Sequence, residues 1–336
     1  MKKMLAILLA AAMAFGLCAC GGGGAAADPG KESTQAPTTE PQPVVMDIDV
    51  GGVTTIGQVA ELQIVNAYAT KDVMPPKPDS VYTHYEASAG NTYFVIVMDI
   101  KNIGGGAVSA SSIISAALAV GEVAYTPVVL VETEDGASLD SGSSTSIDAL
   151  ATARVYHLYS VPEGSDTSNL TMTVLDGDVG YVGTFSMSDF EAKIQTLSAG
   201  SVVTDDATIS LTVDSVEFKN SLYPPRATGY YHYYEADSGK IYLIVKMTVK
   251  NLKGTDMKYD SIAGLSCVYN EKYNYSFFTV LEEDGGEDLN GYPSQYAIAP
   301  LDQGVVYYLA EVPAEVQNGP VVVTLYIAGS YYKIVI

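Results

Sequence analysis

The sequence predicts an all-β protein built from two antiparallel β-sandwich or barrel modules. β-branched and aromatic residues abound, helical periodicity is nearly absent, and turn residues recur about every 8 to 12 positions. The third observation is an internal repeat. Tyr82–Gly105 reads YTHYEASAGNTYFVIVMDIKNIGG, and Tyr231–Gly254, 149 positions later, reads YHYYEADSGKIYLIVKMTVKNLKG. A repeat of this kind indicates a duplicated structural unit.

The N-terminus has the features of an export signal. Three residues with two lysines, Met1–Lys3, precede an apolar stretch from Met4 to Leu17. That stretch is too short to span a bilayer and is typical of a secretory signal peptide. Leu17-Cys18-Ala19-Cys20 resembles a bacterial lipobox, which implies cleavage before Cys20 and a lipid on that residue. We therefore expect residues 1–19 to be a lipoprotein signal peptide; an ordinary signal peptide with two incidental cysteines is the alternative.

A tether is expected after the lipid-bearing cysteine. Residues 20–43 consist mainly of Gly, Ala, Pro, Thr, Glu and Gln, which bury too little apolar surface to offset the entropy of ordering. The sequence therefore predicts a disordered tether and a folded part held at the extracellular face of the cytoplasmic membrane. Cys267 is the remaining cysteine of the folded part, and its apolar surroundings predict a buried, inert thiol.

The first module is assigned to residues 44–187. A Pro-rich excursion, Met74–Pro78, follows its first strands, and an acidic turn, Glu132–Gly136, lies in its middle. Strands are predicted where apolar and β-branched residues concentrate. They cover residues 59–68, 92–100, 112–120, 123–131, 153–161, 170–175 and 181–187.

The repeated stretch predicts a β-hairpin that leads into a long central strand. In the second copy a Tyr-rich run, Tyr230–Tyr234, precedes the turn Ala236–Gly239 and the strand Ile241–Val249. Gly, Asp and Ser are residues that tight turns favour. Side chains along the strand alternate with a period of two, which places Phe94, Ile96 and Met98 of the first copy on one face.

A linker or short helix is expected at residues 188–199, before the second module at residues 200–336. The Pro excursion returns as Leu222–Pro225 and the acidic turn as Glu282–Gly286. Further strands are predicted on the same pattern as in the first module. They cover residues 209–218, 261–269, 273–281, 305–312, 321–327 and 331–336.

Three motifs recur in the same order in both modules. Each long strand ends at an asparagine, Asn102 or Asn251; an acidic residue-Asp-Gly turn follows; and a late strand ends in Val-Pro. Together they resemble the uncharacterised immunoglobulin-like domains of secreted lipoproteins in Gram-positive bacteria, a group similar in fold to a small secreted mycobacterial antigen. The resemblance spans roughly residues 50–187 and 200–336. It implies two tandem immunoglobulin-like antiparallel β-sandwich modules on a cell surface, and it transfers no active site.

Charge and motifs exclude several classes of function. The net charge of −22 at pH 7 repels nucleic acid. The three histidines, His84, His157 and His232, do not have the spacing of a metal site. No GxSxG, HExxH, P-loop or dinucleotide fingerprint occurs. We therefore expect a non-enzymatic protein without a cofactor.

The acidic turn of the second module is the place where a metal ion is conceivable. Carboxylates crowd into ten residues there, as in calcium sites, although not in the order of an EF-hand. The candidate calcium ligands are Glu283, Asp284, Glu287 and Asp288. A solvated hairpin tip is the simpler interpretation, and no metal site is predicted.

Tyrosines supply the candidate binding surface. Their amphipathic rings suit protein interfaces or stacking on sugars, although they also line half-exposed sheets. The candidates are Tyr82, Tyr85, Tyr223, Tyr230, Tyr231, Tyr233 and Tyr234. The sequence thus predicts a membrane-anchored binding module for a protein partner, with a cell-wall or glycan ligand as the alternative.

Overall fold

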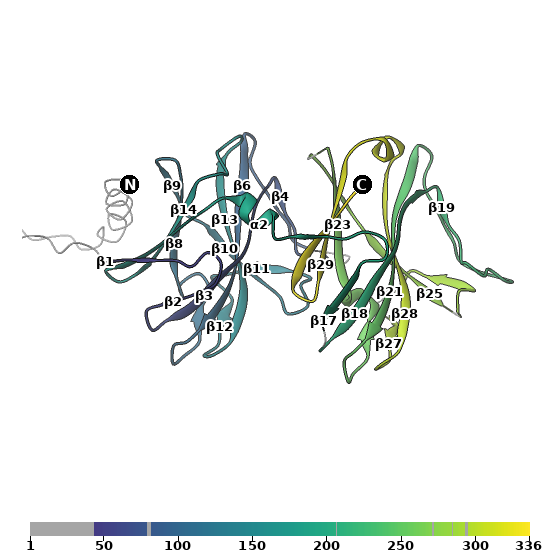
Figure 1. The fold of residues 1–336 in the computed structure, drawn as a ribbon, viewed down its shortest axis with the longest axis horizontal. Coiled ribbons are helices and arrows are strands. Elements are labelled where there is room, and N and C mark those ends of the chain that lie inside the picture. Colours follow the sequence, from purple (N-terminus) through teal and green to yellow (C-terminus); the bar gives the residue numbers. More distant parts are fainter. Residues whose placement is uncertain (1–43, 79–81, 206, 271, 284, 293–294) are drawn as a thin grey trace, which may run out of the picture. The chain divides into compact units, whose positions relative to one another are not determined.

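The computed structural model describes residues 44–78, 82–205, 207–270, 272–283, 285–292 and 295–336. Within them the chain is almost entirely β-structure, which confirms the predicted fold class. Contacts divide the chain into two compact units (Figure 1). Unit 1 comprises the described residues up to Val73, Tyr85–Glu132 and Asp140–Glu191. Unit 2 comprises Met74–His84, Thr133–Leu139 and Ala192–Ile336.

Unit 1 pairs a five-stranded sheet with a six-stranded sheet. Neighbours run antiparallel except β1, which pairs with β15 in parallel. The five-stranded sheet has the order β1 (Val44–Asp47), β15 (Val179–Phe185), β14 (Leu170–Asp176), β8 (Ser115–Val120) and β9 (Val123–Tyr125). The six-stranded sheet has the order β2 (Val53–Ile56), β3 (Ala60–Thr70), β6 (Asn91–Asn102), β13 (Thr152–Pro162), β10 (Val128–Glu132) and β11 (Leu139–Ser141).

Unit 2 has the same two sheets in the same strand order. Its five-stranded sheet is β16 (Gln195–Thr196), β30 (Ser330–Val335), β29 (Val321–Ile327), β23 (Ala263–Tyr269) and β24 (Tyr273–Ser276). Its six-stranded sheet is β17 (Val202–Asp205), β18 (Ile209–Lys219), β21 (Lys240–Asn251), β28 (Gln303–Pro313), β25 (Phe278–Glu283) and β26 (Asp288–Asn290). The sequence repeat is therefore also a repeat of topology.

Short strand pairs complete the pattern. The pairs β4 (Asp72–Val73) with β5 (Tyr85–Glu86) and β7 (Val108–Ser109) with β12 (Ser146–Ile147) match two others. These are β19 (Ser221–Leu222) with β20 (Tyr234–Glu235) and β22 (Met257–Lys258) with β27 (Ala297–Ile298). The helical elements of the described residues are α2 (Met187–Glu191), η1 (Tyr259–Ser261) and η3 (Ala314–Asn318). The predicted linker thus holds a five-residue helix followed by β16.

Each unit buries its core between its two sheets. In unit 1, Ile96 and Met98 of β6 meet Leu118 of β8 and Met172 of β14. In unit 2 the strands β21, β23 and β29 supply the corresponding residues, among them the buried Cys267. These clusters lie entirely at or after Ile48, so a chain that begins at residue 44 keeps the whole core.

The long central strands are confirmed, but the predicted hairpins before them are wrong. β6 and β21 run through the predicted ranges, and Phe94, Ile96 and Met98 share the core face. The Tyr-rich residues before the turn do not pair with the long strand. Only Tyr234 and Glu235 form a strand, β20, and it pairs with β19. Aromatic residues favour strands where a neighbouring strand can pair with them, but none of the described strands pairs with residues 230–233.

Two predicted strands are each divided between the sheets. Residues 123–131 split into β9, which pairs with β8, and β10, which pairs with β13. Residues 273–281 split in the same way into β24 and β25. The chain crosses from one sheet to the other at Pro127 in unit 1, where the imide nitrogen has no hydrogen to donate to a ladder. Apolar residues lie on both sides of the crossing, so the sequence pattern alone predicted one continuous strand.

Candidate binding surface in unit 2

The outer face of the six-stranded sheet of unit 2 carries a second, smaller apolar cluster. Tyr242 and Ile244 of β21 belong to it, whereas their neighbours Leu243 and Val245 point into the core. Leu222 of β19 covers the cluster from one side. The full cluster is Leu222, Tyr242, Ile244, Val280, Leu289, Tyr307 and Leu309. Because Leu289 lies in β26, this cluster fixes both β19 and the acidic turn on the same face.

Between β19 and β20 the chain forms an extended segment, residues 223–233, which we call the arm. It has no helix or strand of its own and projects away from the two sheets of unit 2 (Figure 1). Pro224 and Pro225 near its start have no amide hydrogen, so this part of the arm cannot join a ladder. The sequence therefore keeps the arm out of the sheet although it is rich in strand-forming tyrosine.

Aromatic rings of the arm pack on one another. The rings of Tyr223 and Tyr233 are stacked, with centroids 5.0 Å apart and planes at 9°. Tyr231 contacts each of them at 6.5 Å in an edge-to-face arrangement. Tyr230 meets His232 edge-on at 5.5 Å. The side chains stay accessible, with Tyr230 87%, Tyr233 50% and Tyr223 48% exposed. The arm thus presents a preassembled aromatic cluster to solvent.

Hydrogen bonds fasten the arm to the acidic turn. The amide of Arg226 donates to the carbonyl of Gly286 at 2.8 Å. The Arg226 guanidinium donates to the carbonyl of Gly285. The Thr228 hydroxyl donates to Glu287 Oε2 at 3.1 Å. Through these bonds the acidic turn acts as a support for the arm along its length.

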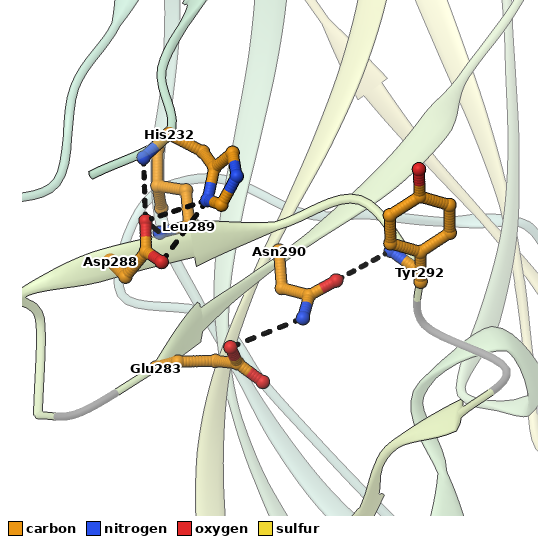
Figure 2. Close-up of polar contacts among 6 residues, drawn as sticks. All are labelled: His232, Glu283, Asp288, Leu289, Asn290 and Tyr292. Atoms are coloured by element: carbon orange, nitrogen blue, oxygen red, sulfur yellow. Dashed lines mark hydrogen bonds and ion pairs between the residues drawn. The ribbon is translucent and has the colours of Figure 1, made fainter. Parts of the chain in front are cut away.

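Asp288 makes the last of these fastenings (Figure 2). Its Oδ1 accepts the His232 amide hydrogen at 2.6 Å and the Leu289 amide hydrogen at 2.8 Å. The His232 ring nitrogen Nδ1 lies 3.1 Å from Oδ2. Partial burial acts to raise the pKa of Asp288, but the hydrogen bonds from His232 and Leu289 outweigh it and hold that pKa below its usual value. The carboxylate therefore stays charged and bound at neutral pH.

The candidate calcium ligands point to different partners. Glu283 accepts a hydrogen bond from Asn290 Nδ2 at 3.1 Å (Figure 2). Glu287 bonds to Thr228 and Asp288 to His232, while Asp284 lies outside the described residues. Among the residues that the structure describes, no three His, Cys, Asp or Glu side chains converge as metal ligands would. The acidic turn supports the arm through Glu287 and Asp288.

The first glutamate of each acidic turn accepts a hydrogen bond from a tyrosine hydroxyl of the same sheet. The hydroxyl of Tyr307 in β28 donates to Glu282 Oε2 at 2.8 Å. In unit 1 the hydroxyl of Tyr156 in β13 donates to Glu132 Oε2 at the same distance. The recurrence of this pair explains why an acidic residue begins the turn in both copies.

The other predicted tyrosines do not join the cluster. Tyr234 is half-buried at the base of the arm, where its ring contacts Phe278 at 5.8 Å. Burial, followed by the nearby Tyr292 and Asp288, raises its pKa. Tyr82 packs edge-on against His84 at 6.4 Å, and Tyr85 lies in β5. Tyr234 therefore helps to hold the base of the arm and is not part of the exposed aromatic cluster.

Two exposed aromatic residues near the arm were missed by the sequence reasoning. Phe278 begins β25 and contacts both Tyr234 and Tyr242, and it remains 40% exposed. Tyr292 follows β26, where its amide donates to Asn290 Oδ1 at 2.8 Å (Figure 2). Both lie more than forty positions after the arm in the sequence, so only the pairing of β25 and β26 with the sheet brings them near it.

The structure describes one of the two cysteines for which the sequence made a prediction. Cys20, the expected lipid attachment site, lies outside the described residues. Cys267 is buried in the core of unit 2, and burial raises its pKa to about 12. The described residues contain no helix long and apolar enough to cross a membrane.

No family model matches the chain, and no protein with a curated description matches it in sequence. Among solved structures, the chain is similar to an uncharacterized β-sandwich protein from Clostridium difficile 630. The two are 24% identical with a TM-score of 0.41, over 43% of this chain and 95% of that one. A conserved hypothetical protein from Bacillus anthracis matches with 11% identity and a TM-score of 0.28, over 42% of this chain and 98% of that one.

Proposed function

We propose that this chain is a non-enzymatic surface protein that binds a protein partner through the arm of unit 2. The lipobox-like Leu17–Cys20 and the tether after it support a lipid anchor on Cys20 at the extracellular face of the cytoplasmic membrane, as in Gram-positive lipoproteins. The observation that carries the proposal is the exposed stack of Tyr223 and Tyr233, together with the exposed Tyr230 of the same arm.

The arrangement of the rings favours a protein partner over a glycan. Sugar binding through stacking needs ring faces that lie open to the ligand. Tyr223 and Tyr233 each give one face to the other, and Tyr231 packs against both edge-on. The neighbouring carboxylates Glu287 and Asp288 already hold the arm. A compact cluster of tyrosine rings packed on one another is instead typical of the aromatic anchors of protein interfaces.

The attachment of the arm adds a second reason. Binding by a loose loop loses affinity to the entropy of ordering it, whereas a preorganised surface avoids that loss. Here the arm is fastened by Arg226, Thr228 and His232 before any partner arrives. Tyrosine rings are also ordered at low entropic cost, because they have only two rotatable side-chain bonds.

The test is a pull-down from cell-envelope material with the chain from residue 44 onward. Tyr223→Ser, Tyr230→Ser and Tyr233→Ser are combined, because these are the exposed rings, while Tyr234 is left intact because it supports the fold. We expect the triple variant to lose at least about 2 kcal/mol of binding free energy, or some thirtyfold in affinity. Tyr273→Ser with Tyr296→Ser removes two exposed rings outside the arm as the matched control.

The retained material is then separated into protein and glycan. Retention of a protein by the wild type and the control, but not by the triple variant, supports the proposal. Retention on purified wall polymer would move the function to a glycan. Equal retention by all three forms would remove the arm from the binding surface.

A further inference from the structure

The arm of unit 2 has a counterpart in the segment Met74–His84, which also belongs to unit 2. Pro75-Pro76-Lys77 and Pro224-Pro225-Arg226 are the same motif, 149 positions apart. The amide of Lys77 donates to the carbonyl of Gly136 at 2.9 Å, as the amide of Arg226 donates to that of Gly286 at 2.8 Å. The two segments therefore share sequence and local attachment to an acidic turn.

Within unit 2, Pro76 and Lys77 of the Met74–His84 segment lie against the start of β23. The Lys77 ammonium donates to the carbonyl of Ser261 at 3.0 Å and lies 5.9 Å from the centroid of the Tyr326 ring. The carbonyl oxygen of Pro76 approaches Gly264 so closely that a Cβ there would overlap it. A segment of this type thus binds a sandwich of this type beside the start of the strand β23.

The strand of unit 1 that corresponds to β23 is β8, which is exposed at its first residue, Ser115. Ser115 stands where unit 2 has Gly264, and Ser112 stands where it has Ser261. Gly264 is buried under the Met74–His84 segment, whereas Ser115 is exposed. Val128, at the start of the neighbouring β10, is also exposed. Among the described residues of unit 1, no segment covers β8 as Met74–His84 covers β23.

A pocket of about 380 Å³ lies beside β8 and β10 in unit 1. Ser115, Val128 and His157 are among its lining residues. His157 is buried, and its Nε2 has no hydrogen-bond partner among the described residues. The corresponding pocket of unit 2 is lined by β23, β25 and Tyr308, and by Tyr82 from the Met74–His84 segment. In the internal repeat, Tyr231 of the arm corresponds to Tyr82.

We propose that the arm of one copy docks in the β8–β10 pocket of unit 1 of a second copy. This inference rests on the proposed function and names its partner, because the described residues of each chain include both the exposed arm and the β8–β10 pocket. Such an interface joins two different surfaces, so it propagates head to tail. Tyr231 would enter the pocket, where its hydroxyl offers His157 Nε2 a hydrogen-bond partner.

One sequence difference, Ser115 in place of Gly264, changes how closely the arm can approach the strand. Ser115 has the Cβ that Gly264 lacks, so the carbonyl of Pro225 stays further from β8 than the carbonyl of Pro76 stays from β23. At that greater distance the Ser115 hydroxyl can donate a hydrogen bond to the carbonyl. The pocket therefore accepts the same kind of segment slightly further from the strand.

The test is sedimentation velocity of the chain from residue 44 onward, which keeps both cores, over a rising concentration series. Wild type is expected to form dimers and longer species. Arg226→Glu with Tyr231→Ser disables the arm, and Ser115→Arg blocks the pocket. Each variant alone should associate at least about tenfold more weakly. An equal mixture of the two should restore association and stop at the dimer, because only one intact arm–pocket pair remains. Thr184→Arg, at an exposed position of β15, is the control and should assemble as wild type does.

Two results would overturn the inference and leave the proposed function standing. One is a wild-type chain that stays monomeric at every concentration while its arm still retains another envelope protein. The other is assembly that is insensitive to both Ser115→Arg and Val128→Arg. A chain that neither assembles nor retains any protein through its arm would overturn both.

Discussion

At the scale of single residues, the repeated asparagines close the fold. Asn251 is buried at the end of β21, where its Nδ2 donates to the carbonyls of Thr255 and Ile298, both at 2.8 Å. Its Oδ1 accepts the Lys253 amide hydrogen at 2.9 Å. Asn102 makes the same three bonds in unit 1. A side chain with two donors and an acceptor in one plane is required here.

Replacing Asn251 should therefore be costly. Asn251→Ala removes the partner of the buried Ile298 carbonyl, of the Thr255 carbonyl and of the Lys253 amide, and we expect a loss of about 2–4 kcal/mol in the free energy of unfolding. Asn251→Asp should be no better, because a carboxylate cannot donate to the two carbonyls. Urea unfolding measures the effect, with Asn274→Ala in the exposed β24 as the control, expected within about 0.5 kcal/mol of wild type. A midpoint for Asn251→Ala equal to that of the control would refute this role.

A second residue-scale feature is a pair of leucines in the left-handed region. Leu150 and Leu301 have φ of 66° and are both exposed. Their amides donate to the carbonyls of Asn102 and Asn251, at 2.8 and 2.9 Å respectively. Left-handed backbone costs a leucine about 1 kcal/mol or more. The turn is thus held in this conformation by the asparagine at the end of the long strand.

At the scale of elements, the arm and the acidic turn form one assembly. The arm lacks a ladder of its own, and its geometry depends on side chains and carbonyls of residues 285–288. The two segments are fixed on one face because Leu222 and Leu289 share the outer apolar cluster. The arm would not hold this shape alone, since it has no strand ladder and Pro224 and Pro225 lack an amide hydrogen. The acidic turn is held by the pairing of β25 with β26.

Asp288→Ala should loosen the end of the arm. It removes the acceptor of the His232 amide, and we expect hydrogen exchange at residues 230–233 to accelerate by about tenfold, with β21 unchanged. Asp288→Asn keeps an acceptor oxygen and is the matched control. Since the pKa of Asp288 is lowered in the folded state, its contribution is present above the unfolded pKa and is lost as the pH falls through the folded value. A protonated carboxyl still has a carbonyl oxygen that accepts a hydrogen bond, so acid should loosen the arm of the wild type only as far as Asp288→Asn does. Equal exchange at residues 230–233 in the wild type and in Asp288→Ala at neutral pH would contradict this account.

At the scale of the whole molecule, the two units share one strand topology but bury a different polar side chain at one matching position. His157 in β13 of unit 1 occupies the position of Tyr308 in β28 of unit 2, opposite Ile96 and Val245 respectively. Burial lowers the pKa of His157 to about 3. Burial raises the pKa of Tyr308 above its usual value. The two units should therefore respond differently to acid.

Unit 1 is expected to lose stability first as the pH falls. The folded pKa of His157 lies below the unfolded value, so its neutral form contributes fully above pH 6.5, and stability declines between about 6.5 and 3. Urea unfolding followed by hydrogen exchange at pH 7 and in acid separates the two units. His157→Tyr, which copies unit 2, should flatten the decline in unit 1. The same pH dependence in wild type and variant would assign the acid sensitivity to other groups.

Much of the fold was predictable, because it depends on local patterns. Period-two alternation located β6, β21 and the strands of the cores, and the repeat at 149 positions implied the duplicated topology. The crossings between sheets at Pro127 and before Phe278 were missed. Strand pairing is decided by partners far away in sequence, and hydropathy along one segment does not report it.

The sequence by itself determined that tyrosines gather around Pro224 and Pro225 and that carboxylates crowd into a turn some sixty positions later. Only the tertiary structure decided that the turn supports the arm and that Glu283, Glu287 and Asp288 bond to different partners. It also decided that Tyr234 is half-buried at the base of the arm, whereas Tyr223, Tyr230 and Tyr233 are exposed. The physical reason is the outer apolar cluster: burying Leu222 and Leu289 on one sheet face brings together two segments that no local pattern relates.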